Sequence, residues 1–426
     1  MAPGWLGSLL NWPFRCIGQR SLPETHGVFE AELQRPTEAE LLRDEFGVPH
    51  IFAATEHEHD LFFLNGVVHA QDRLWQMHSG RMLASGRLCE MVGSKALDLD
   101  RFLRQLGLRQ LAEEDAQHLR DCGLPDSAEA LRMMEAYAEG VNWYAFRCVK
   151  RKRLPLEFTL TGQSWEEWTP VHSLALIRFW GFAMNYGFQH ALLRRSLAEL
   201  LGKDLAELWT NTKEEEASIP FTVDRAAWEA FKKVDLSAIP KIPKGDGSNW
   251  WAVHGKHTST GKPLLVGDPH LSIRIPNFWY EIHGTLRDSQ PFALHGVAPP
   301  GIPATLIGQN GKFANSITLA YCDVEDVFLE RVKDGKYLHK GEWHRCNLRS
   351  EIIKVKNSES QECLCRSTCH GPLLEGQVLG KHEDFKTAML EQVKKEEDEE
   401  VFIAYAAIAL RPKSLSALSL WKILRT

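Results

Sequence analysis

The sequence of 426 residues lacks several features that would assign it to a specialised class of protein. It has no basic excess, because 50 Lys and Arg stand against 56 Asp and Glu, giving a formal net charge of −6. Nucleic-acid-binding domains usually carry a basic excess that neutralises phosphates, so we expect no nucleic-acid partner. A run of about eighteen apolar residues is also missing, which argues against a membrane-spanning helix. The hydrophobic content of 44% is typical of a folded globular protein.

The N-terminus lacks the usual form of a secretory leader. Its first twenty residues contain a short apolar stretch, but the first cation is Arg15, whereas a secretory signal begins with positive charge. We therefore make no prediction of the compartment.

The nine cysteines are odd in number and irregularly spaced, which argues against a full disulfide framework. One group, Cys363, Cys365, Cys369 and His370, could form a metal-binding module. Structural zinc usually requires the C-x₂₋₄-C spacing twice, and no second Cys/His pair lies nearby. Residues two apart share one face of a strand, so a plain strand is the simpler interpretation and the zinc module is the alternative.

The chain changes character along its length. Residues 37–160 are mostly helical in pattern, and the clearest helix follows Pro125, with Asp126 or Ser127 as its cap. Its apolar residues recur at three- and four-residue steps, which indicates a core stripe rather than a cofactor site. This stripe comprises Leu131, Met134, Ala138, Val141 and Ala145. Further helices are predicted over Pro170–Asn185 and His190–Leu201.

The stretch before Gly247 is rich in charge, Pro, Gly and Lys, which predicts an exposed linker open to backbone cleavage. Short apolar runs separated by turns then predict strands, and Asn310-Gly311 predicts a hairpin. We divide the chain into an extension 1–36, a mostly helical part 37–212, a linker 213–247 and a β-rich part 248–426.

Ser248 and His270 flank a predicted hairpin whose turn is centred near Ser259. An antiparallel pair folded there would return His270 beside Ser248, and a serine hydroxyl needs a base within reach to act as a nucleophile. If the Gly247–Ser248 bond were cut, Ser248 would gain an α-amino group with a pKa of about 7.7–8.0, well suited to a general base. Gly247 has no side chain to block the attack. The simpler alternative is a plain junction between a loop and a strand.

Several motifs in order resemble the penicillin acylase family of N-terminal-nucleophile (Ntn) amidohydrolases. They span most of residues 40–425: Gly47-Val48-Pro49-His50-Ile51, His69-Ala70-Gln71-Asp72-Arg73-Leu74-Trp75-Gln76-Met77, Gly86-Arg87, Gly247-Ser248-Asn249-Trp250-Trp251, Asp268-Pro269-His270-Leu271, Gly308-Gln309-Asn310-Gly311, Asp323-Val324-Glu325-Asp326 and His370-Gly371-Pro372. The resemblance implies an α+β fold, the αββα four-layer sandwich, with a mainly helical N-terminal part and an incomplete C-terminal part.

The resemblance also implies roles for individual residues. Ser248 would be the nucleophile with its own amine as base, His270 would orient that amine, and Asn249 would fix the terminal residue. A backbone N–H near Leu319 would stabilise the oxyanion. An apolar acyl pocket would be lined by Leu271, Ile307, Met184 and Phe188. The expected reaction is hydrolysis of a small N-acyl amide, of the penicillin or acyl-homoserine-lactone type, by a self-cleaved two-chain enzyme.

The sequence departs from the family in three places that bear on activity. Phe313-Ala314-Asn315-Ser316 replaces a tryptophan-containing strand of most relatives, so we expect the oxyanion strand to pack differently. The family asparagine that completes the oxyanion hole lies beyond the region matching Leu410–Leu424, so a truncated, inactive relative is the alternative. No cofactor is expected for the chemistry. A structural calcium would use Asp323 and Asp326, but Ala191 occupies the position of a third carboxylate. Two carboxylates supply few of the six to eight oxygens that calcium prefers.

Overall fold

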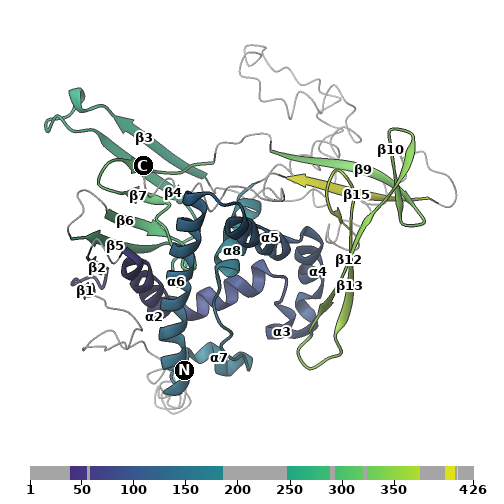
Figure 1. The fold of residues 1–426 in the computed structure, drawn as a ribbon, viewed down its shortest axis with the longest axis horizontal. Helices are drawn as coiled ribbons and strands as arrows, with labels where there is room; N and C mark the ends of the chain where they lie inside the picture. The colour runs from purple at the N-terminus through teal and green to yellow at the C-terminus, as the bar shows by residue number, and fades with distance from the viewer. Residues whose placement is uncertain are drawn as a thin grey trace, which may run out of the picture.

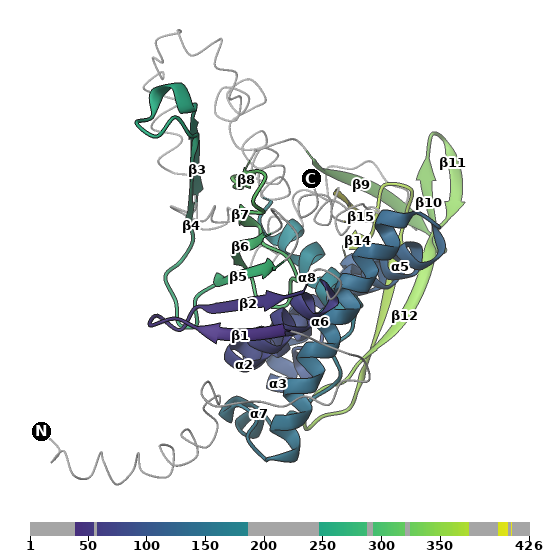
Figure 2. The same ribbon diagram turned by 60° about the vertical axis from the view of Figure 1, so that its left-hand side comes forward.

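The computed structural model describes residues 39–54, 58–185, 247–287, 293–319, 324–374, 399–407 and 410. In this part of the chain a group of helices lies between two separate sheets, and a long hairpin projects outward (Figure 1, Figure 2). The helices and sheets confirm the mixed α+β content, whereas the stacking into four αββα layers stays a prediction. The predicted extension 1–36, the linker before Gly247 and the helix His190–Leu201 lie outside the described residues.

The first sheet joins strands from both halves of the chain. Its spatial order is β1 (Ala39–Arg43), β2 (Pro49–Ala53), β5 (Tyr280–Leu286), β6 (Ala293–Ala298), β7 (Ile307–Gln309) and β8 (Ala314–Asn315). The pair β2–β5 is parallel, and the other neighbours are antiparallel. Along β5 buried residues alternate with more exposed ones, so Tyr280, Ile282 and Leu286 face the helical core. The motif Gly47–Ile51 runs into β2, which begins at Pro49.

Helices fill the described part of the chain between the second and third strands. They are α2 (Glu58–Ala84), α3 (Cys89–Val92), η2 (Gly93–Ala96), α4 (Leu97–Leu106), α5 (Leu108–Asp121), α6 (Pro125–Lys150), α7 (Leu156–Thr161) and α8 (Pro170–Ala183). Helices α6 and α8 confirm the two predicted in these regions. Capping of α6 by Asp126 or Ser127 is wrong, because the N-cap is Leu124 and no side chain caps the helix. Pro125 instead fixes the first turn, where its missing N–H is not needed.

Helices α2 and α6 pack closely against each other where each carries a glycine. A Cβ added at Gly66 would lie 2.1 Å from the carbonyl oxygen of Tyr137, and one added at Gly140 would lie 1.9 Å from that of Phe63. Both distances are far below van der Waals contact, so a side chain at either position would force the helices apart. The predicted apolar stripe of α6 is buried in the core, as is Met133.

The second sheet lies on the other side of the helices (Figure 1). Its order is β11 (Glu342–Arg345), β10 (Lys336–His339), β9 (Glu325–Lys333), β15 (Glu400–Ala407) and β14 (Leu373–Leu374). A separate pair, β12 (Asn347–Ile353) and β13 (Gln361–Ser367), runs beside α4. Leu103 and Leu106 of α4 pack against Ile403 and Tyr405 of β15, which attaches this sheet to the helical layer.

Candidate active site

Ser248 lies near the start of a two-stranded hairpin formed by β3 (Gly247–Val253) and β4 (Leu264–His270). The connecting turn contains the short helix η5 (Gly255–His257), and the Thr258 hydroxyl closes it at 2.8 Å from the carbonyl oxygen of Lys262. The predicted hairpin is therefore confirmed. It projects from the first sheet (Figure 2), which leaves Ser248 half-buried near the base rather than at the exposed tip.

The register of this hairpin differs from the predicted one by one residue. His270 pairs with Gly247, and Ser248 pairs with Pro269. Paired residues share a face and successive residues alternate, so the side chains of Ser248 and His270 project from opposite faces. Direct pairing of these two residues is wrong, because the turn is centred between Thr258 and Ser259 rather than on Ser259. His270 instead adjoins the residue that precedes the predicted new chain end.

His270 belongs to a polar group on one face of the hairpin. Its Nε2 lies 2.8 Å from Oδ2 of Asp268 and 3.4 Å from the side-chain amide nitrogen of Asn249. A bond from Nε2 to the carboxylate leaves Nδ1 for a second partner. Asp268 is absent from the predicted site, although its spacing of two residues from His270 on a strand indicates that the two share a face.

The Gly247–Ser248 peptide bond, which is predicted to break, lies beside the hydroxyl that would attack it. The Ser248 hydroxyl donates to the carbonyl oxygen of Gly247 at 2.6 Å. A Cβ added at Gly247 would meet no atom within 4 Å among the described residues. Among the described residues, the Ser248 hydroxyl thus contacts the Gly247 carbonyl oxygen, and no atom occupies the space of a side chain at Gly247.

Strand β4 meets the first sheet at Gly267. A Cβ added there would lie 2.1 Å from the Ser316 hydroxyl oxygen and 3.2 Å from Cγ2 of Ile307. The hairpin predicted at Asn310-Gly311 is confirmed as β7–β8, which carries both contacting segments to this junction. Leu319 follows Ser316 by three residues and is half-buried, so its segment starts at the same junction. The oxyanion role of the Leu319 N–H stays a prediction.

Three of the four predicted acyl-pocket residues are described, and each lies on a different segment. Ile307 flanks β4, while Leu271 follows β4 and Met184 caps the C-terminal end of α8, each half-buried. Phe188 lies outside the described residues. A cavity of about 920 Å³ lies elsewhere, beside the second sheet, and its lining includes no residue of the β3–β4 hairpin.

The predicted calcium site falls mostly outside the described residues, and two cysteines of the predicted zinc module lie on a strand. Of the calcium carboxylates only Asp326 is described, on β9 opposite Ala406, while Asp323 and Ala191 lie outside the described residues. The calcium site therefore stays a prediction. Cys363 and Cys365 lie on one buried face of β13 with their sulfur atoms 3.8 Å apart, as expected for a plain strand.

The helical signature around Asp72 holds the first sheet to α2. Arg43 Nη1 of β1 donates to Oδ2 of Asp72 at 2.9 Å, and the Tyr280 hydroxyl of β5 donates to the same oxygen at 2.6 Å. In the same signature the His69 Nδ1 lies 2.7 Å from the buried Tyr137 hydroxyl, which accepts from the backbone N–H of Gly301 at 2.9 Å. These residues are therefore structural supports of the sheet that adjoins the hairpin.

Burial lowers the pKa of His69 to about 3, and the Arg73 charge acts in the same direction. An unfolded histidine titrates near 6.5, so below that pH the unfolded chain takes up a proton that the folded chain does not. Stability should therefore fall as the pH drops from 6.5 toward 3, by up to about 1.4 kcal/mol per pH unit from this residue. Urea unfolding at several pH values gives the free energy of unfolding as a function of pH. For His69→Gln this free energy should fall less steeply with decreasing pH than for the wild type. His59→Gln, at an exposed site on the same helix, should keep the wild-type slope, and an unchanged slope for His69→Gln would contradict the assignment.

Comparison with known proteins places the whole described region in one family. The penicillin amidase family model matches residues 38–426. The chain is 33% identical over 384 residues to acyl-homoserine lactone acylase QuiP of Pseudomonas aeruginosa, covering 85% of this chain and 43% of the relative. It is 32% identical over 354 residues to the penicillin acylase 2 proenzyme of Pseudomonas sp. strain SE83, covering 79% and 43% respectively.

A thermostable penicillin G acylase from Alcaligenes faecalis is 22% identical, over 45% of this chain and 98% of that one, with a TM-score of 0.33, too low for a comparison of folds. None of the described helices has both the length and the apolar character needed to cross a membrane. The chain spans less than half the length of the two curated relatives above. With its family model matched over residues 38–426, the chain belongs to the penicillin amidase family.

Proposed function

We propose that this chain carries the nucleophile-bearing part of a self-processing amidohydrolase that cleaves N-acyl small molecules. In the first step the Ser248 hydroxyl attacks the Gly247 carbonyl carbon. The acyl group moves from nitrogen to oxygen, and water then hydrolyses the resulting ester. This releases a carboxylate at Gly247 and an α-amino group at Ser248. The processed protein would be a heterodimer of two chains.

In the hydrolytic reaction the new amine takes the hydroxyl proton as Ser248 attacks the substrate carbonyl. The tetrahedral intermediate expels the amine product and leaves an acyl ester on Ser248, which water then cleaves. We assign His270 to orienting the amine through Nδ1, with the Asp268 carboxylate holding the imidazole on that face through Nε2. Asn249 would fix the terminal residue. The Leu319 N–H would donate to the oxyanion, and one such donor is typically worth about 3–4 kcal/mol of barrier.

The observation that carries this proposal is the position of Ser248. It stands at the start of a two-stranded hairpin, its hydroxyl contacts the Gly247 carbonyl oxygen, and no atom of the described residues lies within 4 Å of a Cβ added at that glycine. The printed names of the relatives, an acyl-homoserine lactone acylase and a penicillin acylase proenzyme, fit an N-acyl substrate and a processed precursor. Leu271, Ile307, Met184 and Phe188 would favour an apolar acyl group. We assign no step to calcium.

Mass spectrometry of the expressed chain tests the proposal. We expect two fragments that meet between Gly247 and Ser248 and together exceed the intact mass by one water. The processed protein should release the amine from an N-acyl-homoserine lactone or from a penicillin, and the same assay ranks the two substrate classes. An uncut chain whose Ser248 is not labelled by an acyl-transfer inhibitor would instead identify an inactive relative.

A further inference from the structure

Three potential metal ligands converge at one end of the second sheet. They are His339 at the end of β10 and the consecutive residues Cys369 and His370 in the turn between β13 and β14. One ligand atom of each lies within 4.8 Å of the other two. We propose that His339, Cys369 and His370 bind a zinc ion. The calcium prediction uses other residues, and the proposal is independent of the acylase function.

The imidazole of His370 is already oriented for such a role. Its Nδ1 lies 2.7 Å from Oε1 of Glu330, a carboxylate that is only 3% exposed. The ring also stacks on Phe328, with centroids 4.1 Å apart and planes at 8°. Histidines that bind metals commonly donate their other ring N–H to a carboxylate, which fixes the tautomer and strengthens the ligand. In His370 this arrangement leaves Nε2 for the metal.

The turn that carries Cys369 is held from both sides. The backbone N–H of Thr368 donates to the Gly371 carbonyl at 2.8 Å, and that of Cys369 donates to the Tyr337 hydroxyl at 3.3 Å. Gly371 has a φ of 141°, and a Cβ there would lie 2.1 Å from the Tyr405 carbonyl oxygen. The turn is thus pinned against β15, so Cys369 and His370 are presented together.

The donor set and spacing suit zinc. Zinc binds thiolate at about 2.3 Å and imidazole at about 2.0–2.1 Å, so tetrahedral ligands stand roughly 3.3–3.8 Å apart. A rotation of the exposed Cys369 side chain and of the half-buried His339 ring closes the remaining gap. Binding would release the thiol proton of Cys369 to solvent.

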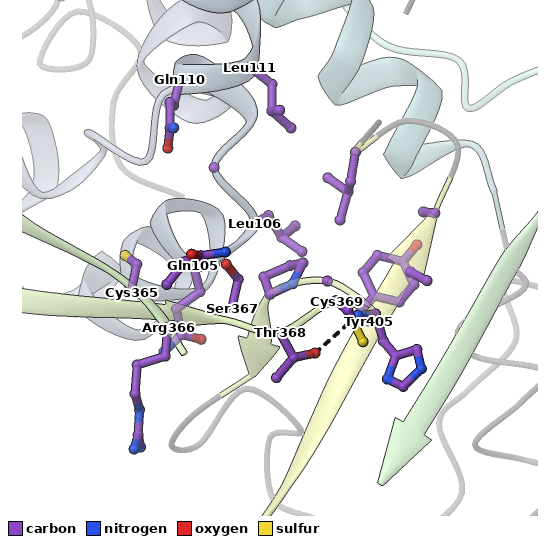
Figure 3. A pocket seen from close by; sticks show the side chains of 18 of the residues that line it. Gln105, Leu106, Gln110, Leu111, Cys365, Arg366, Ser367, Thr368, Cys369 and Tyr405 are labelled. Carbon is purple, nitrogen blue, oxygen red and sulfur yellow. Dashed lines mark hydrogen bonds between the residues drawn. The ribbon is translucent and has the colours of Figure 1, made fainter. Parts of the chain in front are cut away.

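Three protein ligands leave a fourth coordination position for water or a small anion, as in catalytic zinc sites. Cys369 and His370 line the cavity of about 920 Å³, which gives solvent and small ligands access to the ion. Figure 3 shows this cavity with Thr368 and Cys369 on one side and Gln110 and Leu111 of α5 on the other. The proposed ligand set keeps Cys369 and His370 of the predicted zinc module. His339, from a different strand, takes the place of Cys363 and Cys365.

Titration of the full chain with Zn²⁺ alone, followed by calorimetry and metal analysis, tests the site. We expect one tightly bound zinc per chain. Cys369→Ser and His370→Gln should each weaken binding at least about tenfold, and Glu330→Gln about 10- to 100-fold, because it removes the carboxylate that orients His370. Cys122→Ser, a matched substitution of a half-buried thiol on another element, should bind as the wild type does.

A spectroscopic measurement on the wild-type chain tests the site without relying on variants, which could fail to fold. Co²⁺ in place of zinc should give a thiolate-to-cobalt charge-transfer band in the near ultraviolet, and zinc should protect Cys369 from alkylation. Absence of stoichiometric zinc, a cobalt spectrum without the thiolate band, or undiminished affinity in folded Cys369→Ser would each overturn the proposal.

Discussion

Replacing Ser248 with alanine should leave the expressed chain uncut and reduce acyl transfer by several orders of magnitude. The substitution removes the only hydroxyl that contacts the Gly247 carbonyl among the described residues, so neither the N-to-O shift nor the acyl ester can form. The fold should persist, because Ser248 is half-buried in a two-stranded hairpin and alanine is compatible with its strand conformation. Intact-mass measurement after expression reads out the scission, and circular dichroism checks the fold.

Ser259→Ala provides the matched control for this experiment. Ser259 is exposed in the turn of the same hairpin, so its loss alters the hairpin without touching the scissile bond. We expect this variant to be processed like the wild type. Scission that continues between Gly247 and Ser248 in Ser248→Ala would mean that a contaminating protease cuts the linker, and the self-processing mechanism would be wrong.

The sequence predicts the β3–β4 hairpin but not its register. The turn residues around Ser259 and the apolar runs on either side were sufficient to predict that His270 returns close to Ser248. They did not determine the register, because a half-residue shift in the centre of the turn exchanges the face on which every following side chain lies. That shift moved His270 away from Ser248 and placed it with Asp268 and Asn249.

The spacing of residues along the sequence does not predict contacts between distant segments. Cys369 and His370 were visible as potential ligands, but His339 joins them only because β10 and the turn before β14 meet in the second sheet. The crossing of Gly66 and Gly140 likewise depends on how two long helices pack, and nothing in either helix alone specifies its partner. Periodicity identified the buried face of α6 correctly because burial of apolar side chains is a property of the single helix.

The buried ion pair between α5 and α8 has the largest expected effect on stability. Arg178 donates through Nε to Oδ2 of Asp115 at 2.7 Å, and the two side chains are only 2% and 4% exposed. Burial raises the pKa of Asp115 even though the Arg178 charge acts in the opposite direction. Desolvation of the carboxylate therefore outweighs its attraction to the guanidinium, so the pair as a whole adds little net stability.

Breaking one side of this pair should nevertheless destabilise the protein strongly. Asp115→Ala leaves the Arg178 charge buried without its carboxylate, which typically lowers the free energy of unfolding by about 3–5 kcal/mol. The double variant Asp115→Leu with Arg178→Met removes both charges and keeps most of the volume, so urea unfolding should show much of the loss recovered. If the double variant is instead as unstable as the sum of its single variants, packing of the two side chains, rather than an uncompensated charge, governs the contact between α5 and α8.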